Sequence, residues 1–432
     1  MTQSDEHVRM KIVFVIGRIV VSGGNYVVFQ HATHASALGH DVTLVTLYPF
    51  SQHEVNWHPG LAGLKLIHID QIEDLATHDF DLAIATWWRT ALELHRFRAR
   101  QYAYFVQSIE SRFFEPHQEA ERRIVDETYA LGLPGITEAS WIQHYLKQHY
   151  ESNFLLARNG ISKELYLPTG PAHAPRVPGK LRVLVEGPFS LPFKNTARSV
   201  RLSRRGSAYE TWLLTSSNIS WYPGVSRVFS RVPIREVAKI YRACDVVLKL
   251  SFVEGMFGPP LEMFHCGGTA IVYDVSGHDE YIVDGTNALV AKMNDEATVL
   301  AHLNRLRDDP GLLQELKTGA AQTAAAWPDW DESSAQFVSH LEAIRAADPV
   351  PRDKLVAANE KFRVEYPGIF ESGRSVAPMG SSGGLLSSGL RRIKTRISAM
   401  TTLLGYVAEG YGAPYDHQHA LHPAISRTQP HD

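Results

Sequence analysis

Short apolar runs alternate with segments of helical spacing along most of this chain, and that alternation constrains the fold more than any other feature. Apolar runs without polar alternation are typical of parallel strands that are buried on both faces. Strands and helices that follow one another in this way favour doubly wound parallel sheets. The expected strands lie at 11–17, 41–49, 64–70, 80–88, 102–108, 181–187, 246–251 and 269–275, and the expected helices at 25–38, 117–131 and 138–150.

A change of composition divides this pattern in two, because residues 166–180 contain four prolines and two glycines. We therefore expect a Rossmann-like domain over 1–165, a linker over 166–180 and a second Rossmann-like domain over 181–330. A helix at 331–347 and an extension at 348–432 complete the chain. Open parallel sheets bind ligands beyond the carboxyl ends of their strands, and ligand sites are common at domain interfaces. The pattern thus predicts two domains that face each other across a cleft, plus a C-terminal extension.

The bulk composition is that of a globular protein, with 44% hydrophobic and 21% charged residues. A net charge of −3 gives no general attraction to nucleic acid. The two cysteines lack metal-ligand spacing and fit a reducing compartment. The amino-terminal segment lacks the layout of a signal peptide, and no apolar run approaches the roughly 20 residues of a membrane span. We expect a cytoplasmic protein that binds no nucleic acid.

Two carboxylates, Glu254 and Glu262, flank a glycine-containing turn that leads into a helix pattern. A helix that begins near Gly258 would place Glu262 about one turn into the helix. The backbone N–H groups of Met256, Phe257 and Gly258 would then lie at a helix N-terminus, which attracts phosphate. Carboxylates on either side of such a turn can accept hydroxyls of a sugar. The motif predicts a nucleotide-sugar site, although a turn before a helix is also common without any ligand.

The segment SFVEGMFGPPLEMFHCGGTAIVYDVSGHDEYIVDGTNALV (251–290) resembles the C-terminal signature of family-4 retaining glycosyltransferases of the GT-B fold. Three further segments are similar to other parts of that family. They are the first glycine loop and helix at 22–46, the interdomain segment at 157–168 and the second phosphate loop at 185–195. The resemblance implies an α/β GT-B architecture with a donor-binding second domain and an acceptor-binding first domain.

The resemblance also implies roles for individual residues. Glu254 would contact the donor sugar, Glu262 would accept a hydrogen bond from the pentose, and the amides of 256–258 would hold the diphosphate. Lys194 would neutralise charge on the leaving diphosphate, an electrostatic effect of a few kcal/mol per well-placed group. The alternative for Lys194 is an ordinary solvated lysine. The family usually has an arginine where this chain has Pro188.

Because proline cannot bind phosphate, either another cation compensates or donor binding is weakened. The candidates are Arg231, Lys249, Arg204 and Arg205. We favour Arg231, whose segment resembles the part of the family fold near the nucleotide base. No metal ion or organic cofactor is implied.

In the first domain, Gly23 and Gly24 follow a strand and precede a helix, without the spacing of a dinucleotide fingerprint. The resemblance places this loop at the cleft, near the donor phosphate and the acceptor. The alternative is a tight turn that needs positive φ.

Segment 104–141 is similar to a bacterial subgroup of rhamnosyltransferases. Gln107 stands near the place of a histidine in many relatives, and a glutamine can orient a hydroxyl but cannot act as a base. Glu110 and Arg112 could contact the acceptor or could pair locally. Trp87 and Trp88 could stack on a sugar or could pack under a loop.

In the extension, apolar residues recur with helical spacing at Leu390, Ile393, Ile397, Met400 and Leu404, and basic residues crowd the first half. A basic amphipathic helix over 390–407 could contact an anionic membrane surface or could dock on the enzyme or a partner. The histidines of the chain do not suggest a metal site.

Together these observations predict a metal-independent retaining glycosyltransferase. The subgroup resemblance suggests dTDP-L-rhamnose as the donor and a glycan or lipid-linked glycan as the acceptor, in the synthesis of cell-surface polysaccharide. The alternatives are another GT-B enzyme, such as a nucleotide-sugar epimerase or hydrolase, and a catalytically silent scaffold that binds nucleotide sugar.

Overall fold

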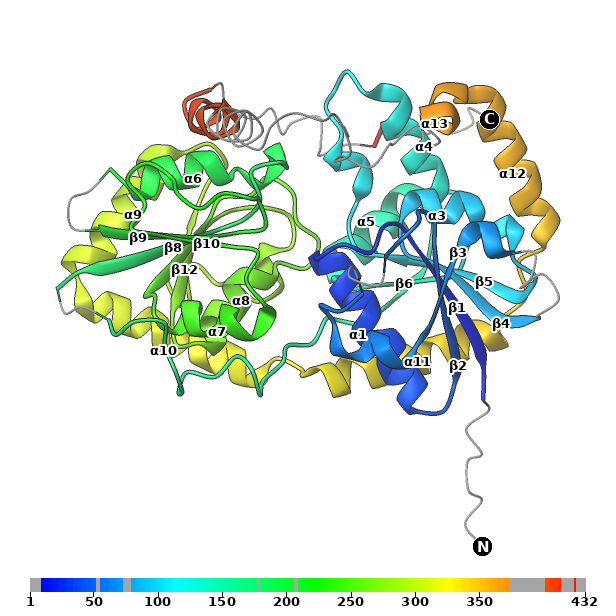
Figure 1. The fold of residues 1–432 in the computed structure, drawn as a ribbon, viewed down its shortest axis with the longest axis horizontal. Helices are drawn as coiled ribbons and strands as arrows, with labels where there is room; N and C mark the ends of the chain where they lie inside the picture. The colour runs from blue at the N-terminus through cyan, green and yellow to red at the C-terminus, as the bar shows by residue number, and fades with distance from the viewer. Residues whose placement is uncertain are drawn as a thin grey trace, which may run out of the picture. The chain divides into compact units, whose positions relative to one another are not determined.

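The computed structural model describes residues 9–51, 55–72, 79–176, 179–205, 209–372, 401–412 and 423–424. These residues fall into two compact units, each built around one parallel sheet (Figure 1). The first unit contains Met1–Gly160, Pro328–Arg374 and Gln418–Asp432. The second contains Ile161–Trp327 and Ser375–His417.

The sheet of the first unit has the strand order β3-β2-β1-β4-β5-β6-β7, with every neighbouring pair parallel. The chain runs outward from β1 to β2 and β3, and then crosses to β4 on the other side of β1. The strand order therefore reverses between β1 and β4, as in doubly wound folds. The strands span Lys11–Ile16 (β1), Asp41–Thr46 (β2), Lys65–His68 (β3), Phe80–Ala85 (β4), Ala99–Val106 (β5), Gly135–Thr137 (β6) and Phe154–Leu156 (β7).

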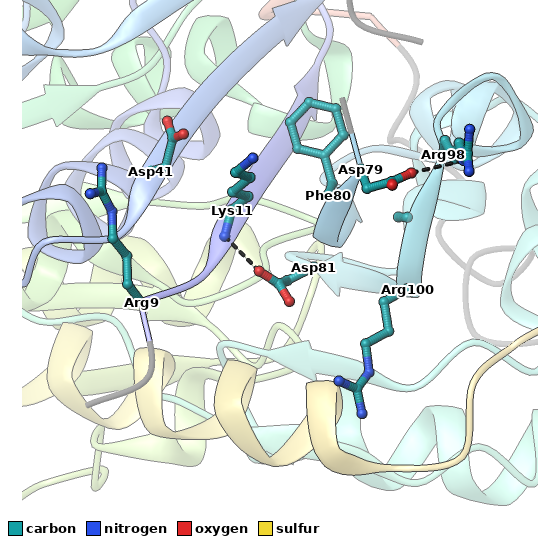
Figure 2. A pocket seen from close by; sticks show the side chains of 9 residues that line it. Arg9, Lys11, Asp41, Asp79, Phe80, Asp81, Arg98 and Arg100 are labelled. Atoms are coloured by element: carbon teal, nitrogen blue, oxygen red, sulfur yellow. Dashed lines mark hydrogen bonds and ion pairs between the residues drawn. The ribbon is translucent and has the colours of Figure 1, made fainter. Parts of the chain in front are cut away.

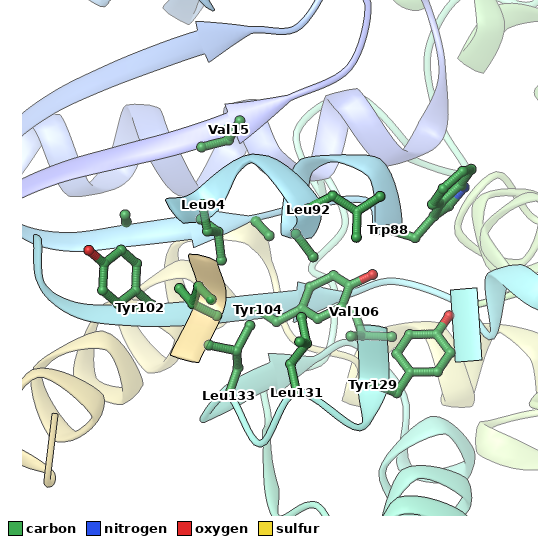
Figure 3. Packing of buried hydrophobic residues seen from close by; sticks show 14 of the residues in the cluster. Val15, Trp88, Leu92, Leu94, Tyr102, Tyr104, Val106, Tyr129, Leu131 and Leu133 are labelled. Atoms are coloured by element: carbon green, nitrogen blue, oxygen red, sulfur yellow. The ribbon is translucent and has the colours of Figure 1, made fainter. Parts of the chain in front are cut away.

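Helices cover both faces of this sheet, and β5 shows how its side chains divide between them. Tyr102 and Tyr104 enter one apolar core together with α3 and α4, as Figure 3 shows, whereas Ala103 and Phe105 enter the other core with α1 and α11. The period of two that a strand imposes produces this division. The helices are α1 (Gly23–Ala37), α3 (Trp88–Glu93), α4 (Glu119–Tyr129), α5 (Ser140–Tyr150), α11 (Trp330–Ala346), α12 (Arg352–Glu365) and α13 (Pro367–Ser372).

The expected helix at 331–347 is α11, and it packs in the first unit although it follows the second unit in the sequence. Its residues Phe337, Val338, Leu341 and Ile344 lie in the core that contains β1. The buried imidazole of His31 stacks on Phe337 at 4.0 Å between ring centroids. The helices α12 and α13 were not predicted.

The sheet of the second unit has the order β10-β9-β8-β11-β12-β13, again with all pairs parallel. Its order reverses between β8 and β11. The strands span Leu181–Glu186 (β8), Tyr209–Thr215 (β9), Arg227–Ser230 (β10), Val246–Lys249 (β11), Thr269–Tyr273 (β12) and Leu289–Ala291 (β13). The helices are α6 (Thr196–Ser203), α7 (Ile234–Arg242), α8 (Gly258–His265), α9 (Glu296–Asp308) and α10 (Pro310–Ala326).

A further helix at 401–409 belongs to the second unit. The expected amphipathic helix at 390–407 is therefore described only from residue 401, and its residues 390–400 lie outside the described part of the chain. Among the described residues, no helix has both the length and the apolar character that crossing a bilayer requires.

Candidate functional site

The second unit gathers buried charges where its strand order reverses. β8 ends at Glu186 and β11 ends at Lys249, so both side chains lie at the carboxyl edge of adjacent strands. The Lys249 ammonium lies 2.5 Å from the Glu186 carboxylate and 3.1 Å from the Glu186 carbonyl oxygen. Lys249 is 3% exposed. Open α/β sheets bind their ligands at this position, beyond the strand ends at the reversal point.

Lys194 and Glu254 form a second ion pair at the same edge, with 2.7 Å between Nζ and Oε2. Sixty residues of sequence separate them, and two loop contacts bring them together. The Phe252 amide donates to the Phe193 carbonyl at 2.8 Å, and the Asn195 side chain donates to the Leu250 carbonyl at 2.9 Å. The loop after β8 and the loop after β11 are thus joined on both sides of the ion pair.

The surroundings favour the charged forms of these groups. Burial alone would raise the pKa of Glu254, which is 5% exposed, but Lys194 and Lys249 outweigh burial and the net pKa is lowered. Burial would likewise lower the pKa of Lys249, but the carboxylates of Glu186, Glu254 and Glu262 outweigh it and the net pKa is raised. Lys249 therefore stays cationic and Glu254 stays anionic at neutral pH.

Glu262 lies in the second turn of α8 and has a different charge state. Burial and the nearby Glu186 carboxylate raise the pKa of Glu262 to about 7, and hydrogen bonds from Tyr241 and Tyr166 limit the rise. The carboxyl is thus divided between its neutral and charged forms at neutral pH. A group in this state can both donate a hydrogen bond and accept one.

The loop before α8 differs in detail from the expected phosphate cradle. The Gly258 amide donates to the Met256 carbonyl at 3.0 Å, so the expectation of an outward Gly258 amide is wrong in this structure. Pro259 and Pro260 have no N–H to offer in the first turn. Phe257 is fully buried in the apolar core of the unit. The contact of residues 256–258 with a diphosphate stays a prediction.

The loop after β8 begins with Gly187, which has a φ of 147°, and Pro188 follows. A Cβ atom on Gly187 would approach the Thr196 hydroxyl to 2.6 Å and the Lys249 ammonium to 3.5 Å. Only glycine therefore lets this loop pass so close to the two ion pairs. Lys249 lies close to Gly187 in this loop. Of the four cations named as substitutes for the arginine that the family has at position 188, Lys249 is the one beside Glu254.

The favoured substitute, Arg231, occupies a different place. It follows β10, at the edge strand of the sheet, with a left-handed backbone φ of 54°. Its guanidinium donates to the Ser216 carbonyl at 3.0 Å. Its contact with a donor stays a prediction. Arg204 and Arg205 line a separate hollow, near the start of β9.

In the first unit, the predicted cleft residues lie at the carboxyl ends of β1, β4 and β5. A Cβ atom on Gly24 would lie 3.4 Å from the Gln107 side-chain oxygen, so the α1 N-terminus and the end of β5 are adjacent. Gly23 and Gly24 have negative φ, which excludes the alternative of a positive-φ turn. The half-buried Trp87 lies against Gly17 at the end of β1.

Glu110 is 7% exposed and accepts a hydrogen bond from the Trp88 amide at 2.8 Å. Burial raises the pKa of Glu110 to about 8, so the carboxyl is largely neutral at pH 7. The buried Arg112 guanidinium lies 4.9 Å from the ring centres of Trp141 and Tyr145. These contacts favour local pairing for Glu110 and Arg112, and Trp88 is buried beside them.

A hollow of about 740 Å³ lies at the opposite edge of the first sheet, where β1, β2, β4 and β5 begin (Figure 2). Two of its carboxylates have partners: Asp79 contacts Arg98 at 2.8 Å, and Asp81 accepts from the Lys11 amide at 2.9 Å and from Arg345 outside the hollow. The hollow lies at the edge where these sheets do not bind ligands. No cluster of potential metal ligands occurs among the described residues.

Comparison with known proteins agrees with this arrangement. Residues 224–323 match the model of the family Glycosyl transferases group 1, and they include Lys249, Glu254 and Glu262. Sucrose-phosphate synthase from Thermosynechococcus elongatus superposes with a TM-score of 0.61 at 15% identity, over 78% of this chain and 100% of that one. Anabaena HepE in complex with UDP and glucose gives 0.62 at 14%, over 78% and 100%. The fold is that of the GT-B glycosyltransferases.

Two curated relatives extend the comparison. The O-antigen biosynthesis protein RfbC of Myxococcus xanthus is 28% identical over 279 residues, which are 61% of this chain and 21% of that protein. D-inositol 3-phosphate glycosyltransferase of Streptomyces bingchenggensis is 32% identical over 111 residues, 26% of this chain and 24% of that protein. The matches thus span about a fifth to a quarter of the length of these two relatives.

The sequence analysis did not identify Glu186 as a site residue, and it named Lys249 only as one of four candidate cations. Each is the last residue of a mostly apolar parallel strand that precedes a loop. A charged residue at the last position of a buried strand was the available signal.

Proposed function

We propose that this protein is a retaining glycosyltransferase that uses a nucleoside-diphosphate sugar. The observation that carries the proposal is the double ion pair Lys194–Glu254 and Lys249–Glu186 at the reversal point of the second sheet. Two buried or half-buried cations at one strand edge suit a diphosphate, whose charge grows as the sugar leaves. The group 1 match, which includes Lys249 and Glu254, supports this assignment.

In the proposed reaction, the bond between the sugar C1 and the diphosphate oxygen breaks, and a bond forms between C1 and an acceptor hydroxyl oxygen on the same face. The proton of that hydroxyl passes to the departing diphosphate. Lys194 and Lys249 neutralise the diphosphate, and Glu254 accepts hydroxyls of the sugar. Because the chain supplies these cations, we propose that transfer needs no metal ion or organic cofactor.

We further propose dTDP-L-rhamnose as the donor and a glycan or lipid-linked glycan as the acceptor, in cell-surface polysaccharide synthesis in the cytoplasm. The subgroup resemblance of segment 104–141 and the similarity to an O-antigen biosynthesis protein support this choice. Glu262 would bind the pentose hydroxyl. Gly24, Gln107 and Trp87 would contact the acceptor.

The test is product analysis with the full chain, dTDP-, UDP- and GDP-sugars, and free or lipid-linked glycan acceptors, with and without EDTA. We expect acceptor-dependent transfer with retained anomeric configuration, unaffected by EDTA and favoured with dTDP-L-rhamnose. Glu254→Gln should lower transfer about 100-fold or more, whereas Arg98→Ala in the hollow of the first unit should not. Epimerised or hydrolysed donor without an acceptor product would support another GT-B enzyme. Donor binding without any conversion would support a scaffold, and either result would overturn the proposal.

A further inference from the structure

The two ion pairs at the carboxyl edge of the second sheet face solvent in opposite ways. In the first pair the cation is the outer member, because the side chain of Lys194 is 21% exposed and that of Glu254 is 6% exposed. In the second pair the anion is the outer member, with 23% exposed for Glu186 and 3% for Lys249. A ligand that reaches this edge from solvent therefore meets one ammonium directly, but it meets the carboxylate of Glu186 before the second ammonium.

This order matters because the charges of the two pairs already balance. Each ammonium lies against a carboxylate, at 2.7 Å for Lys194 and at 2.5 Å for Lys249. The two pairs together leave no net positive charge for a diphosphate, which carries several negative charges. If the second ammonium is to bind a diphosphate, its carboxylate partner has to give way.

Lys249 can lose the carboxylate of Glu186 without losing its place. One of its three N–H groups donates to the Glu186 carbonyl oxygen at 3.1 Å, and this oxygen belongs to the backbone of β8. β8 and β11 are adjacent strands of the sheet, so the main chain itself sets this contact. The Glu186 carboxylate, by contrast, has Lys249 as its one hydrogen-bonding partner among the described residues, and it is partly exposed. The carboxylate is therefore free to turn into solvent while the lysine stays.

We propose that Glu186 is a counter-ion that competes with the donor diphosphate for Lys249. In the donor-free protein its carboxylate covers and neutralises the ammonium. When the donor binds, the carboxylate turns away and a phosphate oxygen takes its place. After transfer, the carboxylate returns and favours release of the nucleoside diphosphate. Glu186 thus acts through Lys249 and touches no reacting atom, and its role rests on the proposed function, which places a diphosphate at this edge.

The alternative role for Glu186 is only to hold Lys249 in position. The two roles predict opposite results for Glu186→Gln, which removes the charge but keeps an oxygen that can accept from Lys249. A competing counter-ion repels the diphosphate, so its removal should tighten diphosphate binding. A residue that only holds the lysine should, when replaced, leave diphosphate binding unchanged or weaken it.

The experiment is calorimetric titration of dTDP into the full chain, as wild type and as Glu186→Gln. We expect the Kd for dTDP to be about tenfold lower in the variant. Stopped-flow measurement of the same complex should show slower dissociation of dTDP. In steady-state transfer, dTDP should inhibit the variant at about tenfold lower concentration and the KM for the donor should fall. A purely structural role would not produce this direction of change.

Glu210→Gln is the matched control, because it removes the same charge from an ion pair of the same sheet. Glu210 of β9 contacts Arg182 at 3.1 Å, and Arg182 lies four residues before Glu186 in β8. Four residues of extended strand span roughly 13 Å, more than the screening length of about 8 Å at physiological ionic strength. Binding of dTDP to Glu210→Gln should therefore equal binding to the wild type. Thermal unfolding checks that both variants are folded.

Equal or weaker dTDP binding by folded Glu186→Gln, next to a wild type that binds dTDP, would overturn the role of Glu186 and leave the proposed function standing. An equal gain in Glu210→Gln would also overturn it, because the gain would then follow from net charge alone. A wild-type chain that binds none of dTDP, UDP and GDP and transfers no sugar would overturn the proposed function as well.

Discussion

The two sheets of this protein share a topology but end in chemically different edges. At the reversal point of the first sheet, the strand ends carry Trp87, Gln107 and the adjacent Gly24, and the nearby Glu110 is held largely neutral by burial. At the reversal point of the second sheet there are two ion pairs, in which Lys249 and Glu254 keep their charges in spite of burial. The difference teaches that a fold repeated within one chain fixes where a ligand binds, while strand-end residues fix which chemistry is possible.

The largest effect that tests this contrast is expected from Lys194→Ala. The charged edge would lose the cation nearest Glu254, so kcat should fall about 100-fold or more because charge on the leaving diphosphate is less stabilised. Steady-state kinetics with saturating donor and acceptor measures it. Lys239→Ala, which removes a half-exposed lysine of the same unit, should leave kcat within about twofold. Equal kcat for both variants would contradict the role of the charged edge.

The next effect concerns folding of the same edge. Lys249→Met would leave Glu186, Glu254 and Glu262 without their shared buried cation, and should lower the free energy of unfolding by about 3 kcal/mol. Urea unfolding followed by circular dichroism gives this quantity. The double variant Lys249→Met/Glu186→Gln should recover part of the loss, because one of the unpaired charges is removed. A single variant as stable as the wild type would show that these carboxylates do not depend on Lys249.

The last effect is expected at the neutral edge and depends on pH. The pKa of Glu110 is raised from 4.5 to about 8 in the folded state, so folded protein holds the proton that unfolded protein releases. Stability is therefore lost as pH rises between these two values, with a slope of at most about 1.4 kcal/mol per pH unit. Glu110→Gln lacks this loss, so its stability relative to the wild type should increase from pH 5 to pH 8.

Urea unfolding at pH 5, 6, 7 and 8 measures this change for both proteins. Glu254→Gln provides a control whose stability difference from the wild type should stay nearly constant from pH 5 to pH 8, because the pKa of Glu254 is lowered from 4.5 and its carboxyl is ionised in both folded and unfolded protein over this range. Parallel stability curves for Glu110→Gln and the wild type would contradict a neutral Glu110.

Local pattern was enough to predict much of the fold. The apolar runs at 11–17 and 181–187 gave β1 and β8, and the spacing in 331–347 gave α11, because burial on both faces leaves a clear signature in sequence. The helices α12 and α13 were missed because the extension was read from its composition. Their contacts with the first unit depend on residues far away in the chain.

The candidate site was predicted in part. Glu254 and Lys194 were named, but their pairing depends on loop contacts between residues about sixty positions apart, which no local pattern reveals. The Gly258 amide donates a hydrogen bond to the Met256 carbonyl within its own loop. This contact depends on backbone angles, which a sequence motif does not specify. The sequence pattern placed Leu404 on the apolar stripe of the C-terminal helix, but Leu404 is exposed and its neighbour Leu403 is buried. Which face of this helix is buried depends on the surface it packs against.

Calorimetric titration of dTDP into the full chain tests the central assignment most directly, because it isolates diphosphate binding from catalysis. The account predicts saturable binding to the wild type, binding weakened at least tenfold in Lys194→Ala, and unchanged binding in Arg98→Ala at the hollow of the first unit. Equal affinity of the wild type and Lys194→Ala for dTDP would contradict the placement of the diphosphate at the charged edge of the second sheet.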